Sequence, residues 1–376
     1  MAILIESERR RSQLDRLASG RELEVGEPWL APLPPSVLAS LDERHPAVRG
    51  VFDGGLTAVV YRIHVDGRDW AVKRARTPCL VRNVDGQTSF LNELQRRAEL
   101  AALKAQPGGR ERFAGLVDTV WGSLRHGVIV SPWIDGQPIA RWTPRTLRQA
   151  YRLGRELVRA GFFEWDFSPG NVLDDGREVH LFDFGYMYRF DPLRQFNSAG
   201  DGRAAPQCHL AERLETRHLF GSWLGLPDGE ALAAFREAKV CALDAYRQLA
   251  AELAADGASA EVRAWLDGII ARWAAALAGD LHPLWRCEGW RSHVIDLEDD
   301  LGGRTCTPDT LRRVDWLLAA LDTDHATLAA HGALFGDDVG RSRERLHADY
   351  TARRAQAAEW QVPRTRADRP AVTAAP

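Results

Sequence analysis

The chain has 376 residues, of which 45% are hydrophobic and 27% charged, so it can bury a sizeable core and form one large or two medium domains. A net charge of −3 argues against a surface built to bind nucleic-acid phosphates. No apolar run approaches the roughly 18 residues that a membrane-spanning helix needs.

The numbers and positions of lysines and cysteines limit the kinds of functional site that this chain can form. Only three lysines accompany 46 arginines, a bias that makes each retained lysine more informative (Lys73, Lys104 and Lys239). The five cysteines are scattered and form no C-x-x-C pair, so neither a disulfide framework nor a zinc knuckle is indicated. The opening MAILIESERRR has apolar residues before charged ones, the reverse of a signal peptide. We therefore expect a cytoplasmic protein with reduced thiols.

Residues 1–45 are expected to form an extension before the main fold. A polar helix opens the chain, and a proline-rich stretch and a short helical segment follow it. The extension is predicted to pack on the main domain or to be partly mobile. It carries no recognisable chemistry.

Strand patterns begin after Val51. Apolar residues alternate with polar ones over 59–65, Asp66-Gly67 is typical of a hairpin turn, and the return strand begins at 70–73. Because side chains alternate across a strand, Ala71 and Lys73 should share one face. A small side chain beside a lysine leaves room for a flat ligand with a charged end.

A helix is predicted over 88–105, capped by Thr88 or Ser89 and carrying Glu93. Two further strands are expected at 117–121 and 128–131. Residues 46–130 would then form a small α+β unit, which the connector Pro132–Gly136 joins to the rest of the chain.

The stretch 163–185 contains the densest group of candidate ligands. A helix that begins with Thr143 as its cap and Pro144 in its first turn, and stops at Gly161, leads into it. Within the stretch, Asp174-Asp175-Gly176 predicts a hairpin, which brings the residues before its first strand close to those after its second. The hairpin should therefore gather three oxygen-bearing side chains that can hold Mg²⁺ against phosphate oxygens (Asp166, Asn171 and Asp183).

The chain after this stretch is predicted to be mostly helical. An irregular segment at 186–207 precedes helices at 208–225, 228–256, 259–280, 308–332 and 336–360. Residues 131–355 would form this second unit with its helical extension, and 356–376 a disordered tail.

These residues, in this order, resemble the protein-kinase-like superfamily, particularly its atypical and small-molecule branches. Those branches include the lipopolysaccharide-core kinases of the Kdo and WaaP type, the RIO and Bud-type kinases, and the aminoglycoside phosphotransferases. The resemblance covers about residues 50–190. It implies a bilobal α+β fold with a small antiparallel-sheet lobe and a larger, mostly helical lobe.

The resemblance implies an ATP site in the first part of this range. Trp70-Ala71-Val72-Lys73 looks like the V-A-I-K strand, whose lysine holds ATP phosphates while its alanine faces adenine. Glu93 resembles the helix glutamate that pairs with the lysine, and Glu99 is the alternative. Gly54-Gly55 stands where a glycine-rich loop belongs, although a plain hairpin turn explains it equally well. Ser131–Gly136 resembles the hinge, with Trp133 and Ile134 beside the adenine.

The catalytic and metal-binding residues implied by the resemblance lie in the second part. Asp166 resembles the catalytic-loop aspartate, and Asn171 and Asp183 the two metal ligands. The implied reaction is Mg²⁺-dependent transfer of the γ-phosphate of ATP to a hydroxyl of a small molecule, a glycan or a protein, with Asp166 accepting the proton. Glu164-Trp165-Asp166 replaces H-R-D, and no A-P-E follows D-F-G, so a conventional regulated Ser/Thr kinase is disfavoured.

Two alternatives keep the same fold. One is a pseudokinase that binds nucleotide or a partner without turnover, and the other transfers the nucleotidyl group. Three further groups of residues lie outside these motifs. The segment 197–217 either contacts the acceptor or ties the preceding segment to the helices, the second being favoured. The other two are expected to be a solvated acidic face and ordinary structural residues without a zinc pattern (Asp296, Glu298, Asp299 and Asp300; His282, Cys287, His293 and Cys306).

Overall fold

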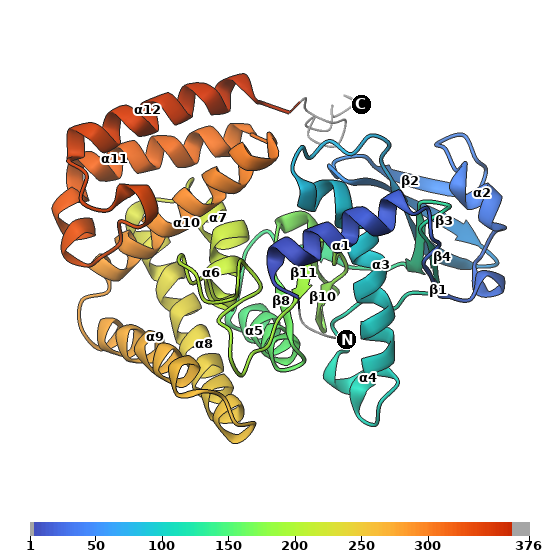
Figure 1. Ribbon diagram of the computed structural model, residues 1–376, viewed down its shortest axis with the longest axis horizontal. Coiled ribbons are helices and arrows are strands. Elements are labelled where there is room, and N and C mark those ends of the chain that lie inside the picture. Colours follow the sequence, from blue (N-terminus) through green and yellow to red (C-terminus); the bar gives the residue numbers. More distant parts are fainter. Residues whose placement is uncertain (1–3, 363–376) are drawn as a thin grey trace, which may run out of the picture.

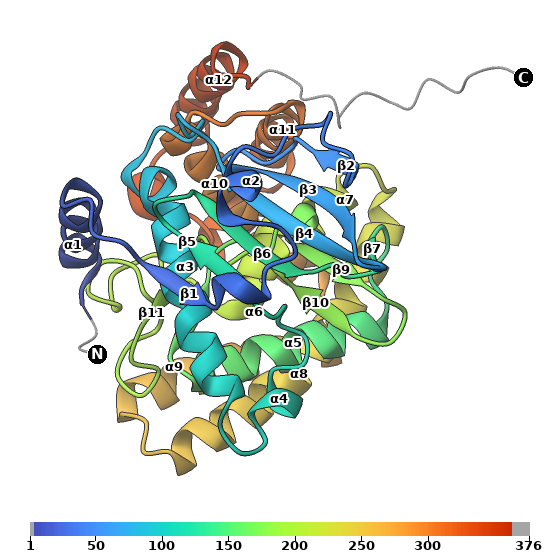
Figure 2. The same ribbon diagram turned by 90° about the vertical axis from the view of Figure 1, so that its right-hand side faces the viewer.

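A six-stranded antiparallel sheet forms the small N-terminal region in the computed structural model, which describes residues 4–362 (Figures 1 and 2). The predicted hairpin is confirmed, with Asp66 and Gly67 at φ 51° and 74°, the positive values that a tight hairpin turn requires. The strand predicted at 117–121 is wrong, because pairing begins only at Trp121. In spatial order the strands are β1 (Glu24–Gly26), β5 (Trp121–Ser123), β6 (Val128–Pro132), β4 (Arg68–Ala75), β3 (Ala58–Val65) and β2 (Val48–Phe52).

The two faces of this sheet differ: one packs into an apolar core and the other lines a cleft. On one face Val72, Ile63 and Val130 are fully buried and pack with Leu38 of α2 (Pro35–Ala39). The opposite face of β4 presents small and charged side chains to a cleft, as the alternation predicted. The short helical turn η1 (Pro28–Leu30) follows β1.

The long helix of this region, α3 (Val84–Lys104), starts four residues before the predicted start. Asn83 caps it, with its side-chain oxygen accepting the Gly86 N–H at 2.8 Å. The prediction that Thr88 or Ser89 is the cap is therefore wrong. Both lie inside the helix, where their hydroxyls donate to carbonyls of the preceding turn. A short helix, α4 (Gly109–Arg112), follows.

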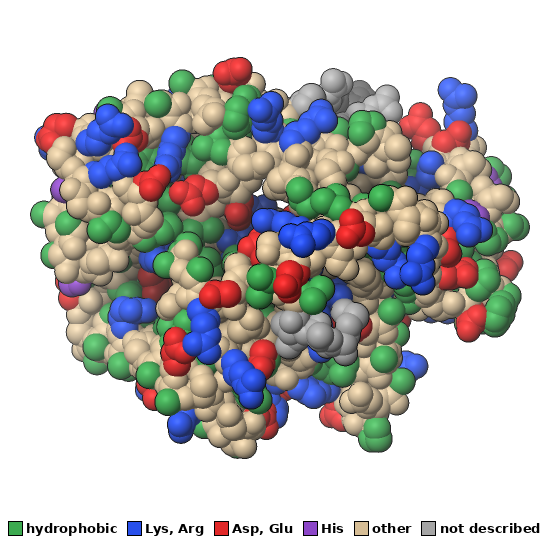
Figure 3. Space-filling view, in the orientation of Figure 1, with side chains coloured by type: hydrophobic (Ala, Val, Ile, Leu, Met, Phe, Trp, Pro, Cys, Tyr) green, Lys and Arg blue, Asp and Glu red, His purple; other side chains and the backbone are tan. Residues whose placement is uncertain are grey.

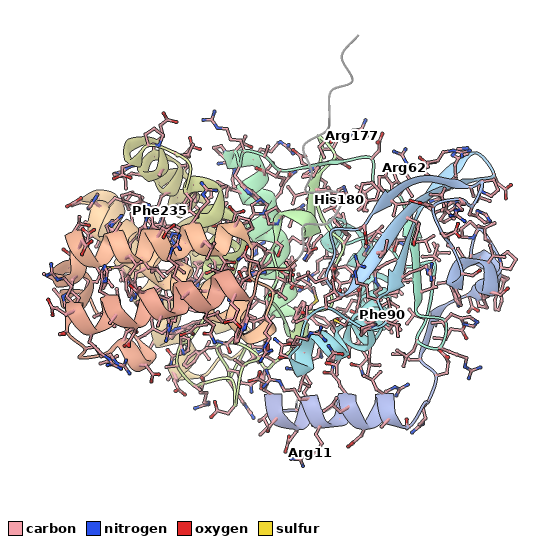
Figure 4. All side chains as sticks on the ribbon, turned by 90° about the horizontal axis from the view of Figure 1, so that it is seen from above. Arg11, Arg62, Phe90, Arg177, His180 and Phe235 are labelled. Atoms are coloured by element: carbon pink, nitrogen blue, oxygen red, sulfur yellow. The ribbon has the colours of Figure 1, made fainter. Side chains whose placement is uncertain are left out.

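Residues 4–45 pack against this region. Helix α1 (Glu6–Ala18) lies along α3 (Figure 2). Arg9 and Arg10 both pair with Asp85. Arg11 points away from the body of the protein (Figure 4). Because β1 also adds an edge strand to the sheet, the segment is integrated into the fold rather than appended to it.

The larger C-terminal part is mostly helical, with two small sheets where it meets the cleft. One sheet has the order β10 (Val179–Leu181), β9 (Val172–Asp174) and β7 (Gln137–Pro138), and the other pairs β8 (Phe162–Glu164) with β11 (Met187–Arg189). The helices are α5 (Pro144–Arg159), α6 (Leu210–Leu214), the π-helical turn η3 (Glu215–Leu219), α7 (Phe220–Trp223), α8 (Asp228–Ala255), α9 (Ala260–Ala278), α10 (His282–Gly303), α11 (Pro308–Ala330) and α12 (Arg343–Glu359), with short turns η2 (Pro169–Asn171) and η4 (Gly336–Asp338).

Several helix predictions are confirmed and others need correction. Thr143 caps α5 with Pro144 in its first turn, as predicted. Helix α10 occupies a segment for which no helix was predicted, and α12 begins seven residues after the predicted start at 336. Because α12 continues to Glu359, order extends past the predicted boundary at 355. The rest of the predicted tail, 363–376, lies outside the described residues.

Two apolar clusters hold the helical part together. The larger is built mainly around α5, α8 and α9, and the smaller joins α10, α11 and α12. Among the helices of residues 4–362, none is both long and apolar enough to cross a membrane.

Acid should destabilise this helical part through His209, the cap of α6. Its Nδ1 lies 2.7 Å from the Tyr246 hydroxyl and 3.3 Å from the Glu212 N–H. Burial lowers the pKa of His209 from 6.5 to about 3, so the unfolded chain binds a proton more readily than the folded one. Stability should therefore fall as the pH drops below 6.5, by roughly 2 kcal/mol at pH 5 from this residue alone.

Urea unfolding between pH 7.5 and pH 5 measures this effect. His209→Gln should flatten the pH dependence, whereas His347→Gln, on the exposed surface of α12, should leave the slope unchanged. Equal slopes for wild type and His209→Gln would show that this histidine does not set the acid response.

Candidate functional site

A cleft of about 1080 Å³ separates the sheet region from the helical part. Its walls come from the open face of the sheet, the stretch around residues 165–188, helix α1 and the end of α10. Figure 3 shows the surface hollowed between the helical part and α1. Candidate ligands far apart in sequence therefore meet in one place.

The hairpin β9–β10 forms as predicted and gathers the three expected residues. Val172 pairs with Leu181, so Asn171 and Asp183 flank the open end of the hairpin. The Asn171 side-chain amide donates to Asp166 Oδ2 at 3.0 Å. All three oxygen-bearing side chains line the cleft.

Lys73 joins the two halves of the cleft. Its Nζ lies 2.6 Å from Glu93 Oε2 on α3 and 2.7 Å from Asp183 Oδ2 after β10. Glu99, the alternative partner, instead pairs with Arg96 on the same helix. The strand, the helix and the hairpin thus contribute one charged group each to a single ion triad.

Electrostatics keep Lys73 and Asp183 ionised despite their burial. Burial lowers the pKa of Lys73, but attraction to Asp183 and Glu93 outweighs it and raises the pKa above its ordinary value. Burial likewise raises the pKa of Asp183, and Lys73 more than reverses that effect. At neutral pH the site therefore presents an ammonium group and an ionised carboxylate.

Arg97 is a member of the site that the sequence motifs did not reveal. One turn after Glu93, its guanidinium donates to Glu93 Oε1 at 2.9 and 2.7 Å, and to the Phe182 carbonyl at 2.8 Å. A further bond of 3.2 Å reaches the Ser131 hydroxyl in β6. The spacing of four residues between Glu93 and Arg97 could have predicted that these two side chains pair on the helix. Nothing in the sequence indicated that Arg97 also contacts the hairpin.

The other end of the cleft is lined by small and aromatic groups. Ala71, Trp133 and Ile134 line it beside the connector. The Trp133 ring lies 5.5 Å from the Phe52 ring, and the Arg62 guanidinium, labelled in Figure 4, is 4.7 Å from the Trp133 ring centre. This end can accept a flat apolar group.

Gly54 and Gly55 also line the cleft, in the loop between β2 and β3. A Cβ at Gly55 would lie 2.6 Å from the Ala58 carbonyl oxygen, so only glycine fits there. Arg76 holds the loop by donating to the Gly55 carbonyl at 2.7 Å. The segment is thus a close-packed loop rather than a simple two-residue hairpin turn.

Asp166 is held from several directions. Ser168 donates its hydroxyl to Asp166 Oδ1, and Arg217 Nε lies 3.2 Å from the same oxygen. The buried Glu164 accepts the Asp166 N–H at 2.7 Å, and burial raises the pKa of Glu164 well above its usual range. Of these partners, Arg217 was not predicted, because 51 residues separate it from Asp166.

A buried amide ties α1 and α3 to the segment after Asp183. Asn92, fully buried beside Glu93, donates to the carbonyls of Gly185 at 3.0 Å and Met187 at 2.9 Å. Its own side-chain oxygen accepts a bond of 3.0 Å from Gln13 of α1. Helix α1 therefore braces the same segment that positions Asp183.

The acidic run was predicted to be a solvated face, and for Asp296 this is wrong. Asp296 is buried in α10 and pairs with Arg217 at 2.5 Å and Arg313 at 2.7 Å, because these cations offset the cost of burying its charge. Asp299 pairs with Arg213 at 2.9 Å, which ties the segment 197–217 to α10.

Three of the four His and Cys residues nearby pack inside the helical part. Cys287 and Cys306 lie in the smaller apolar cluster, and His293 bonds to Arg313 while its ring packs against Trp316. His282, at the start of α10, is exposed. Within residues 4–362 no group of three or more His, Cys, Asp or Glu side chains has the arrangement of a metal site.

No family model matches the chain, and no curated protein is detectably similar to it in sequence.

Proposed function

We propose that this protein is a protein-kinase-like phosphotransferase that uses ATP and Mg²⁺ to phosphorylate a hydroxyl group. The observation that carries this proposal is the ion triad of Lys73, Glu93 and Asp183, assembled in the same cleft as Asp166 and Asn171. Phosphoryl transfer depends mainly on positioning and on neutralising phosphate charge, and this triad supplies fixed charges for both.

The two ends of the cleft suit the two ends of ATP. Ala71, Trp133 and Ile134 would receive the adenine, and Lys73 would hold the phosphates beneath the Gly54-Gly55 loop. In support, both glycines line the cleft, and a side chain at Gly55 would strike the Ala58 carbonyl of the same loop, so glycine keeps this loop compact above the site. Glu93 and Arg97 keep Lys73 in place from α3.

The oxygen donors fit Mg²⁺. Asp183 supplies an ionised carboxylate, and because the Asn171 amide nitrogen is bonded to Asp166, its amide oxygen remains for a cation. Mg²⁺ prefers few protein ligands and completes its shell with water and phosphate oxygens, so two side chains suffice. When bound, the metal would neutralise charge on the phosphates.

Asp166 would orient the acceptor. The acceptor hydroxyl loses its proton to Asp166 while its oxygen forms a bond to the γ-phosphorus, the bond to the β–γ bridging oxygen breaks, and ADP leaves. Small molecules, glycans and protein hydroxyls remain the candidate acceptors.

Labelled ATP tests this proposal. With label on the γ-phosphate, the wild-type protein should release or transfer the label, and with label on the α-phosphate it should transfer none. Label arriving from the α-position would instead establish nucleotidyl transfer. A melting temperature raised by Mg-ATP without turnover would support the pseudokinase alternative, and no shift at all would refute the ATP site.

A further inference from the structure

Arg217 occupies a distinctive position at the acceptor side of the cleft. It belongs to the π-helical turn Glu215–Leu219 between α6 and α7, a rare geometry that recurs at functional sites. Its Nε lies 3.2 Å from Asp166 Oδ1, and its Nη2 lies 3.5 Å from the Ser168 hydroxyl. The side chain lines the cleft and is 22% exposed, so it is reachable from the cleft.

A second carboxylate, that of Asp296, also binds the Arg217 guanidinium group. Asp296 Oδ1 lies 2.5 Å from Arg217 Nη1, while Asp296 Oδ2 is engaged by Arg313 Nε at 2.7 Å. Two aspartates therefore face two arginines in this network, which fixes the Arg217 guanidinium without adding net negative charge. Burial lowers the pKa of Arg217, but attraction to Asp296 and Asp166 outweighs it and keeps the group cationic.

The loop that carries Asp166 contains no cation of its own. From Glu164 to Asn171 it reads EWDFSPGN, and its charged residues are acidic. Lys73, the proposed phosphate-binding cation, lies on the other side of the site between Glu93 and Asp183. Because transfer spreads negative charge over the phosphoryl oxygens, a cation beside Asp166 would stabilise the transition state.

We infer that Arg217 is a catalytic residue that fixes the Asp166 carboxylate and donates a hydrogen bond from Nη2 to the phosphoryl group in transit. This inference rests on the proposed phosphotransferase function. Arg217 keeps its own protons throughout, since Asp166 receives the proton of the acceptor. A purely structural Arg217–Asp166 pair would affect folding but leave turnover of the folded protein unchanged.

ATP hydrolysis, with water as the acceptor, tests the inference without knowledge of the natural substrate. Arg217→Gln should lower kcat by about 10²-fold or more while the KM for ATP stays near the wild-type value, because the ATP-binding groups are intact. Arg217→Lys should recover part of kcat, since it retains charge but not the forked geometry. Arg203→Gln is the matched control, because Arg203 pairs with Glu261 and does not line the cleft.

Asp296→Asn provides a variant that leaves both Arg217 and Asp166 in place. It should lower kcat less than Arg217→Gln, and it still tests the inference if Arg217→Gln fails to fold. A folded Arg217→Gln protein with the wild-type kcat would overturn the role of Arg217. The same conclusion would follow if the two single variants Arg217→Lys and Asp296→Asn were both folded and both had the wild-type kcat. Failure of the proposed function is distinguishable, because it appears as absent turnover in the wild-type protein itself.

Discussion

Asp183→Asn is expected to lower the rate of phosphoryl transfer by about 10³-fold while the protein stays folded. The substitution preserves size and keeps an oxygen that can accept the Gly185 N–H, now 3.0 Å from Asp183 Oδ1. It removes the negative charge that pairs with Lys73 at 2.7 Å and that would bind Mg²⁺. Initial rates of γ-phosphate release at saturating Mg-ATP measure the effect.

Asp175→Asn is the matched control for this experiment. Asp175 lies at the turn of the same hairpin, where it bonds to His180 at 2.8 Å and does not line the cleft. The control should keep the wild-type rate, and thermal melting should show both variants folded. A folded Asp183→Asn protein with the wild-type rate would refute the assignment of Asp183 as a metal ligand.

The local parts of this site were predictable from sequence because each depends on residues close together in the chain. The hairpin turn at Asp174–Gly176 dictates that Asn171 and Asp183 end side by side. Strand alternation places Ala71 and Lys73 on one face of β4. The position of Glu93 followed from the helix around it, although the helix start did not, since several polar residues there can serve as a cap.

The long-range parts were not predictable, because their signals are contacts rather than patterns. Arg217 meets Asp296 across 79 residues, and neither position stands out in a chain rich in arginine and acidic residues. The general tendency of charge runs to face solvent pointed the wrong way for Asp296. Gln13 likewise bonds to Asn92 only because α1 packs against α3, and the polar sequence of the first helix does not predict that contact.

Lys239→Met is expected to be the most destabilising single substitution considered, at about 3–5 kcal/mol. Lys239 is fully buried in α8, and its ammonium lies 2.6 Å from Glu215 and also contacts Glu288. Burial raises the pKa of Glu215 to about 8, although attraction to the Lys239 ammonium group opposes this shift. Methionine fills similar volume but leaves both glutamates without the cation that they share.

Urea or guanidinium unfolding at pH 7.5 measures the loss. Lys104→Met is the control, because Lys104 pairs with Asp118, whose side chain is 54% exposed, and donates to the Leu116 carbonyl; it should cost less than Lys239→Met, since Asp118 stays in contact with water. A loss for Lys239→Met as small as that of the control would contradict the buried ion cluster.

A triple variant separates lost charge from lost packing. Adding Glu215→Gln and Glu288→Gln to Lys239→Met removes the unpaired acids, and it should restore most of the stability. If the triple variant recovers no stability, the loss comes instead from contacts of the Lys239 side chain with Trp273, whose ring centre lies 4.3 Å from the ammonium group. Glu215 also opens the π-helical turn that carries Arg217, so the cluster anchors the backbone that aims this arginine at Asp166. Lys239→Met should therefore lower turnover even under conditions in which it remains folded.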